Sequence, residues 1–225
     1  TDYILEQRRN SRRAGPDDYV VTTLVTTGMI RRIAQSYDVQ AHTDLLVGFK
    51  WICDRMDEVG PDGFAFGTEE SHGYLVGKYA RDKDGAVACM LMSELAAKLK
   101  SEGTTLHDKL ESLHWQHGYH AERLLNLKMA GAQGMQRMVE LMATMRSAPP
   151  ETLGGMAIKQ IRDYEAGTVT LIGGQTAPLD GPTGNLIVLD LAETGNSIAV
   201  RPSGTEPKVK FYMFAYVAPE QIPDM

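Results

Sequence analysis

Cysteine, aromatic residues and long apolar runs are all scarce in this sequence. Of the 225 residues, only Cys53 and Cys89 are cysteines, and neither has a CxxC partner or a histidine at metal-ligand spacing. We therefore expect two buried free thiols, not a disulfide or a metal site. No window approaches the roughly 18 uninterrupted apolar residues of a membrane span, and no charged start precedes an apolar run. We expect a cytoplasmic protein with no membrane partner.

An excess of positive charge is also missing. Lys and Arg number 23 against 29 Asp and Glu, which leaves a net charge of -6 and argues against nucleic acid as a partner. The chain is 43% hydrophobic, and its length suits two compact units because domains usually have about 100 to 150 residues. It starts at Thr1 within an expected helix, from Asp2 to Arg13, so we infer that it was cut from a longer protein.

In the first part of the chain, predicted strands alternate with predicted helices. The β-branched run from Tyr19 to Val25 is typical of a buried strand, and apolar residues from Met29 onward keep helical spacing. This alternation indicates a mainly parallel sheet covered on both faces. The further elements that we expect are a short strand at Val39–Ala41, a helix capped by Thr43 or Asp44 that runs to Met56, a strand at Phe64–Phe66 followed by a polar loop from Gly67 to Gly73, and a helix at Ala86–Lys100.

The second part of the chain has a different pattern. A polar helical stretch at Leu106–Gly118 is expected to connect two domains, and a helix is expected at Gln133–Met145. Methionines 135, 138, 142 and 145 at helical spacing are most simply core residues. Several strands without long intervening helices indicate an antiparallel α+β domain. They are expected at Glu122–Lys128, Met156–Tyr164, Val169–Ile172, Asn185–Leu191, Ser197–Val200 and Lys208–Val217.

A segment between two predicted strands, Arg201 to Lys210, has a composition suited to an anion. It reads Arg-Pro-Ser-Gly-Thr-Glu-Pro-Lys-Val-Lys and offers a guanidinium, hydroxyl groups, a glycine that allows close approach, and ammonium groups. Backbone N–H groups in such a turn can point at phosphate oxygens. From composition alone, a solvated hairpin loop fits equally well.

A second polar segment, from Gly67 to Tyr74, follows a short apolar strand. It reads Gly-Thr-Glu-Glu-Ser-His-Gly-Tyr, and ligands usually bind at this end of the strands in α/β sheets. The carboxylate of Glu69 and the hydroxyl of Ser71 could bind adjacent sugar hydroxyls. Taken alone, the segment is more often a solvated loop, with His72 an ordinary loop histidine.

Together, these two segments resemble the third and fourth domains of the α-D-phosphohexomutase family, which includes phosphoglucomutases and phosphomannomutases. The resemblance extends to Arg-Asp-Lys-Asp-Gly at residues 81–85, Thr27-Gly28, Gly48-Phe49-Lys50-Trp51 and Gly118-Tyr119, in the order found in the family. It implies a third-domain α/β/α sandwich with a mixed, mainly parallel sheet at residues 1–118. It also implies an α+β domain with an antiparallel sheet, like that of TATA-box-binding proteins, at residues 119–225.

The resemblance also implies roles for individual residues. Gly67, Glu69, Ser71 and Lys50 match the positions that bind the sugar. Arg201, Ser203, Gly204 and Thr205 match the loop that binds the phosphate not being transferred, with Lys210 as a further candidate. Asp82 and Asp84 belong to the third-domain segment and are not expected to bind metal.

In the family, a phosphoserine of the first domain exchanges a phosphoryl group with a sugar monophosphate through a sugar 1,6-bisphosphate, assisted by Mg²⁺ bound in the second domain. Neither motif occurs here. We therefore expect the C-terminal part of a phosphohexomutase, inactive alone, whose partners are a phosphorylated hexose and its own missing N-terminal domains. Positioning and charge stabilisation are most of what such a transfer requires.

The substrate of the parent is expected to be a glucose phosphate. Family members that act on hexosamines or mannose often have a histidine after the glycine of the sugar segment, whereas His72 precedes Gly73 here and Tyr74 follows it. A phosphomannomutase or phosphopentomutase parent stays open as an alternative. A phosphosugar-binding module with no catalytic parent is the alternative from another functional class.

Overall fold

The computed structural model describes residues 1–204 and 206–223, and the chain divides into two compact units. The first unit contains Thr1–Tyr119 together with the segment that starts at Ala218, and the second contains His120–Val217. We describe each unit by itself.

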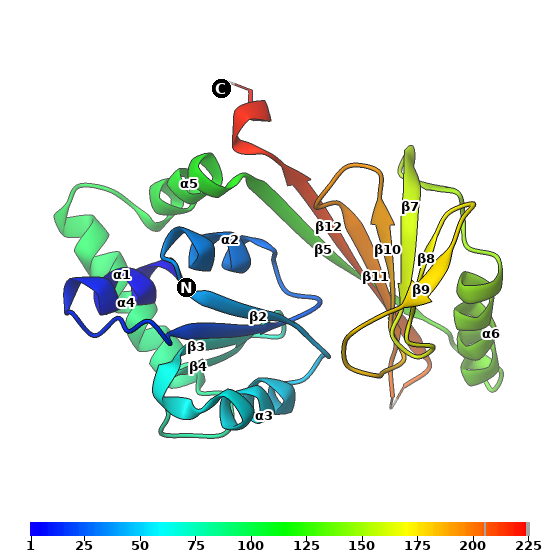
Figure 1. Cartoon of the computed structure of the whole chain (residues 1–225), viewed down its shortest axis with the longest axis horizontal. Helices are drawn as coiled ribbons and strands as arrows, with labels where there is room; N and C mark the ends of the chain where they lie inside the picture. The colour runs from blue at the N-terminus through cyan, green and yellow to red at the C-terminus, as the bar shows by residue number, and fades with distance from the viewer. Residues whose placement is uncertain (205, 224–225) are drawn as a thin grey trace. The chain divides into compact units, whose positions relative to one another are not determined.

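The first unit is built on a mixed sheet with the strand order β2-β1-β3-β4 (Figure 1). Strand β1 (Tyr19–Thr23) pairs in parallel with both β2 (Gln40–Leu45) and β3 (Phe64–Glu69). Strand β4 (Gly73–Val76) is antiparallel to β3. The predicted mixed, mainly parallel sheet is therefore confirmed.

Helices cover both faces of this sheet, because its central strands β1 and β3 are buried along their whole length. Tyr19 and Val21 of β1 pack into one core with helix α3 (Phe49–Val59), and Val20 packs into the other with α2 (Met29–Ser36). Figure 1 shows α2 and α3 on opposite sides of the sheet. The other helical elements of this unit are α1 (Asp2–Asn10), α4 (Gly85–Ser101), α5 (Leu106–His117) and the short turns η1 (Pro61–Gly63) and η2 (Pro219–Gln221). No helix in the described ranges is both long and apolar enough to cross a membrane.

The start of α3 differs from the prediction. Thr43 and Asp44 do not cap this helix, because β2 continues as far as Leu45, whose side chain is in the core. The helix starts after Gly48, whose φ of 128° is outside the range that other residues readily adopt. Both polar residues instead contact Arg31 on the outside of the sheet.

The two cysteines are free, as predicted, but only one is buried. Cys53 lies in the core beneath α3, whereas Cys89 on α4 is exposed. The apolar composition of α4 suggested burial, yet Leu99 is the one residue of this helix that is buried. The expectation for Cys89 was therefore wrong.

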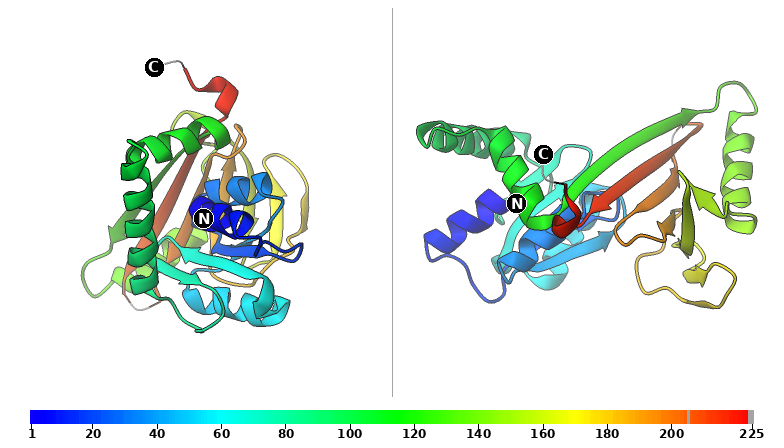
Figure 2. Two further views of the ribbon diagram at one scale, coloured as in Figure 1. Left: turned by 90° about the vertical axis from the view of Figure 1, so that its left-hand side faces the viewer. Right: turned by 90° about the horizontal axis from the view of Figure 1, so that it is seen from above.

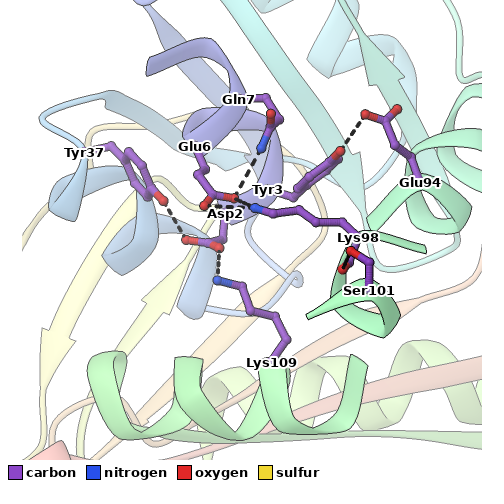
Figure 3. A network of polar contacts seen from close by, with 9 residues as sticks. All are labelled: Asp2, Tyr3, Glu6, Gln7, Tyr37, Glu94, Lys98, Ser101 and Lys109. Atoms are coloured by element: carbon purple, nitrogen blue, oxygen red, sulfur yellow. Dashed lines mark hydrogen bonds and ion pairs between the residues drawn. The ribbon is translucent and has the colours of Figure 1, made fainter. Parts of the chain in front are cut away.

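A network of polar contacts joins α1 to the helices around it (Figure 3). The buried carboxylate of Asp2 accepts a hydrogen bond from the Tyr37 hydroxyl at 2.9 Å and pairs with Nζ of Lys109 at 2.7 Å. The Tyr3 hydroxyl donates to Glu94 at 2.6 Å, which raises the pKa of Tyr3 to about 12. These contacts connect α1 with the residue that follows α2, with α4 and with α5 within the first unit.

The second unit contains a largely antiparallel sheet with the order β5-β12-β11-β10-β7-β8-β9, which confirms the predicted sheet type (Figures 1 and 2). Two short strands of this unit, β6 (Thr152–Leu153) and β9 (Thr176–Pro178), had not been predicted. The remaining strands are β5 (Tyr119–Lys128), β7 (Met156–Asp163), β8 (Thr168–Leu171), β10 (Ile187–Leu191), β11 (Ser197–Pro202) and β12 (Lys208–Val217).

Helix α6 (Gly134–Ser147) packs its methionines against the sheet of the second unit. Met138 and Met142 are buried in the core with Ile187 and Val200, and Met145 packs against the same cluster. Met135 is exposed. The prediction that the methionine stripe fills the core is confirmed for three of its four members.

Candidate functional site

The first group of candidate residues lies at one edge of the sheet of the first unit. Strands β1, β2 and β3 are parallel, so the segments that follow them all emerge at the same edge. The segment after β1 leads into α2 at Gly28, and the segment after β2 leads into α3 at Gly48. This carboxyl edge is where open α/β sheets bind ligands.

The predicted polar loop after β3 is shorter than expected. Strand β3 continues to Glu69, and β4 begins at Gly73, with Glu69 directly opposite Gly73 in the ladder. His72 adopts a positive φ of 64° in the tight turn between them. Gly67 and Glu69 are thus strand residues. Ser71 lies in the turn, is exposed, and donates a hydrogen bond to Glu70 at 2.9 Å.

The side chain of Glu69 is largely buried, although its carboxylate oxygens keep some contact with solvent. Glu69 is 8% exposed as a residue, and its side chain makes no hydrogen bond or ion pair with any residue that the structure describes. Burial is the main cause that raises the pKa of Glu69, the neighbouring charges of Glu70 and Asp82 add to the rise, and Lys83 opposes it. Loss of solvent around a carboxylate without a compensating donor disfavours its charge, so this position favours a ligand that supplies hydrogen bonds.

Two glycines make room for this arrangement. A Cβ atom on Gly73 would lie 2.7 Å from Oε1 of Glu69 and 2.7 Å from the ring of Phe49. A Cβ on Gly67 would lie 2.6 Å from Cγ2 of Ile52, on the α3 face of the sheet. Gly73 therefore leaves space for the Glu69 carboxylate, and Gly67 allows α3 to pack closely on β3.

Two lysines lie near this part of the sheet edge. Lys50, in the first turn of α3, is exposed and its Nζ lies 4.7 Å from the centre of the Trp51 ring. It directly follows Phe49, whose ring flanks the Gly73 backbone. Lys83 had not been predicted as part of the site, although its charge lowers the pKa of Glu69 and its Nζ lies 6.0 Å from the Phe49 ring.

Threonines at the end of β1 are further residues that the sequence analysis missed. The hydroxyl of Thr22 donates to the backbone oxygen of Thr68 at 2.8 Å, which fixes β1 against β3 just before Glu69. The hydroxyl of Thr23 contacts both Thr26, at 2.8 Å, and the carboxylate of Glu70, at 3.5 Å. The signal in the sequence was the cluster of threonines at the end of an apolar strand.

The second group of candidate residues lies on the β11–β12 hairpin of the second unit. Arg201 is directly opposite Lys210 in the antiparallel ladder, so both side chains are on the same face. The N–H of Ser203 donates to the carbonyl of Lys208 at 2.8 Å and closes the turn. Gly204 is exposed, and a Cβ at this position would have no atom within 4 Å. Thr205 lies outside the described residues.

The charges of this hairpin are only partly neutralised within the chain. Lys208 pairs with Glu206 at 2.7 Å, and this contact, with the charges of Lys128 and Lys210, holds the pKa of Glu206 below its usual value. Arg201 has no hydrogen-bond or ion-pair partner among the described residues. A guanidinium and an ammonium on one face of a hairpin can bind an anion such as phosphate.

Side chains that could ligate a metal do not cluster in the described ranges. No group of three His, Cys, Asp or Glu side chains lies close enough there to hold an ion. The carboxylate of Asp84 instead caps α4 by accepting hydrogen bonds from the N–H groups of Ala86 and Val87. Asp82 accepts a hydrogen bond from the N–H of Lys83.

Comparison with known proteins identifies the family. The family model described as phosphoglucomutase/phosphomannomutase, alpha/beta/alpha domain III, matches residues 2–114, which is half of the chain. The chain therefore belongs to the phosphoglucomutase/phosphomannomutase family, and its α/β/α first unit corresponds to the third domain.

Individual relatives extend the match to nearly the whole chain. A phosphoglucomutase of Staphylococcus epidermidis is 33% identical over 212 residues, which are 93% of this chain and 38% of the relative. A phosphoglucomutase of Staphylococcus haemolyticus is 33% identical over 196 residues, or 86% of this chain and 35% of the relative. The chain thus spans less than two fifths of the length of these curated relatives.

A solved structure shares the fold. Parafusin, an exocytosis-sensitive phosphoprotein and phosphoglucomutase of Paramecium in its open form, matches with a TM-score of 0.57 and 18% identity. The match covers 100% of this chain and 38% of that protein. At this identity, the likeness concerns the fold alone.

Proposed function

We propose that this chain is the part of a phosphoglucomutase that binds the hydroxyl groups of the sugar and the phosphate that is not being transferred. The whole enzyme would interconvert glucose 1-phosphate and glucose 6-phosphate through glucose 1,6-bisphosphate. Membership of the family and the names of its curated relatives support this proposal.

The largely buried side chain of Glu69, which has no partner among the described residues, is the observation that carries the proposal. An ionised carboxylate offers only acceptors, and adjacent sugar hydroxyls are matching donors. Ser71, two residues further on, adds a hydroxyl that both donates and accepts. A pair of this kind suits both orientations of a sugar bisphosphate, since each orientation presents hydroxyl groups to the same side chains.

Arg201 is proposed to bind the phosphate that is not being transferred, together with Ser203, Gly204, Thr205 and Lys210. The guanidinium is free of internal partners among the described residues, and Lys210 is on the same face of the hairpin. Gly204 leaves its backbone accessible to a phosphate oxygen. Lys50 is proposed to contribute positive charge near the sugar.

These residues would orient the sugar phosphate and stabilise its charge, and they would not form a covalent bond with it. We propose that the phosphorylated serine and Mg²⁺ belong to a part of the enzyme that this chain does not span, since the described residues offer no cluster of metal ligands. The Mg²⁺ would neutralise developing charge on the transferred phosphoryl group. On this proposal, the chain alone is inactive but binds phosphosugar.

The choice of glucose is tested by a substrate panel. The enzyme that contains this chain would be assayed with the 1-phosphates of glucose, mannose, glucosamine and ribose, each primed with its bisphosphate. We expect the highest kcat/KM for glucose 1-phosphate and a large loss of it in the Glu69→Gln variant. Negligible turnover of glucose 1-phosphate would refute the substrate, and an unchanged kcat/KM in the variant would refute the role of Glu69.

A further inference from the structure

The outer strand of the second unit, β5, has a long free edge. Among residues 1–204 and 206–223, β5 is hydrogen-bonded on one side only, to β12, and it ends the order of strands in its sheet. Leu124, Leu125 and Leu127 are 43%, 53% and 43% exposed. Long edge strands with exposed apolar side chains readily pair with another strand.

The contact with β12 determines which backbone groups of β5 face outward. The N–H of Met129 donates to the carbonyl of Pro207 at 2.8 Å, and the two strands run in opposite directions (Figure 2). Backbone groups alternate from side to side along a strand, so those of Lys128 and of every second residue back to Glu122 point to the free edge. These are the groups available to a partner strand.

We propose that two copies of this chain associate by antiparallel pairing of their β5 strands, with Leu125 on the two-fold axis. In this register, Glu122 faces Lys128 of the partner subunit, and Leu124 faces Asn126 of the partner subunit. Each of these pairs joins residues whose backbone groups point outward, as antiparallel pairing requires. About eight interstrand hydrogen bonds result.

Charge and symmetry select a second copy as the partner. A two-fold axis at Leu125 creates the pair of Glu122 and Lys128 twice, so the edge is complementary to itself. An axis at Leu124 would also join outward-facing groups, but it would place Glu122 opposite Asn126 and would lose both charge pairs. Opposite charges directly across a strand pair stabilise it, and like charges destabilise it.

Sedimentation velocity of the chain over a range of concentrations tests the association. We expect a reversible dimer, and we expect Leu125→Lys to abolish it because two ammonium groups would meet at the axis. Glu122→Lys and Lys128→Glu should each raise the dimer Kd about tenfold, because two attractive pairs become repulsive. The double variant restores opposite charges and should recover most of the wild-type affinity.

Lys159→Glu is the matched control, because Lys159 is an exposed residue of the interior strand β7. Its charge reversal should leave the dimer unchanged. A wild-type chain that is monomeric at all concentrations would overturn the proposal, as would a dimer that tolerates Leu125→Lys. If the double variant does not dimerise more tightly than either single variant, the proposed register is overturned. If it does, the weaker dimers of the single variants are not due to misfolding, because the double variant carries both substitutions.

Discussion

Replacing Glu69 with glutamine should have opposite effects on the stability of the free chain and on its affinity for phosphosugar. The wild-type side chain is 8% exposed and unpaired among the described residues, and nearby Glu70 and Asp82 disfavour its charge further. Glutamine has nearly the same size and no charge. We expect Glu69→Gln to stabilise the free chain at pH 7 by about 1 kcal/mol, because the amide is still polar and unpaired but carries no charge to desolvate.

The pH dependence identifies the cause of this stabilisation. The pKa of Glu69 is raised in the folded chain, so the folded state takes up the proton at a higher pH than the unfolded state. The destabilisation by the ionised carboxylate is therefore present above the folded pKa. It is lost as the pH falls from that value through the ordinary value of 4.5. The advantage of the variant should shrink over the same range.

Urea unfolding between pH 4 and pH 8 measures the stability, and isothermal titration with glucose 6-phosphate measures the affinity. Loss of hydrogen bonds to a charged group should weaken binding by about 1.5 to 3 kcal/mol. Glu111→Gln is the control, because Glu111 is exposed on α5. The reasoning is refuted if Glu69→Gln gains no stability at pH 7 relative to pH 4 and binds glucose 6-phosphate as the wild type does.

Three further changes probe the rest of the structure. Arg201→Ala should weaken glucose 6-phosphate binding by about 1.5 to 3 kcal/mol by titration, whereas Arg13→Ala, at an exposed arginine of the other unit, should not. Gly67→Ala should lower the free energy of unfolding in urea by about 1 to 3 kcal/mol, because its Cβ would overlap Ile52. Gly85→Ala is the control and should be neutral or stabilising, because a Cβ there has open space at the start of α4. Equal stability of the two variants would contradict this packing. Lys109→Met should lower the free energy of unfolding at pH 7 by about 2 kcal/mol, because it leaves the Asp2 carboxylate with Tyr37 alone, and an unchanged value would show that the pair contributes nothing.

The sequence predicted the elements with strong apolar patterns well. The β-branched run after Asp18 forms the central strand β1, and the largely apolar run Lys208–Val217 forms β12 with the predicted bounds. These segments are recognisable because burial selects their side chains at every or every second position. Short strands such as β6 and β9 carry too few residues to show such a pattern.

The candidate site was predictable in its residue types but not in its local structure. Gly67, Thr68 and Glu69 read as a polar loop, whereas they are buried residues of β3. Polar residues at the end of a buried strand resemble a loop in sequence, since only their neighbours in space determine that they are buried. The nearby contributions of Lys83 and Thr23 depend on contacts between segments far apart in the chain and could not be predicted from spacing.

The central proposal is that the Glu69 and Arg201 segments bind a phosphorylated hexose, and backbone amide NMR of the chain tests it most directly. Titration with glucose 6-phosphate should shift the amide signals of residues 69–73 and of residues 201–204. Inorganic phosphate should shift the second segment alone, and glucose at high concentration the first alone. Glucose 6-phosphate that leaves both segments unperturbed, or that perturbs only residues elsewhere in the chain, would contradict the account.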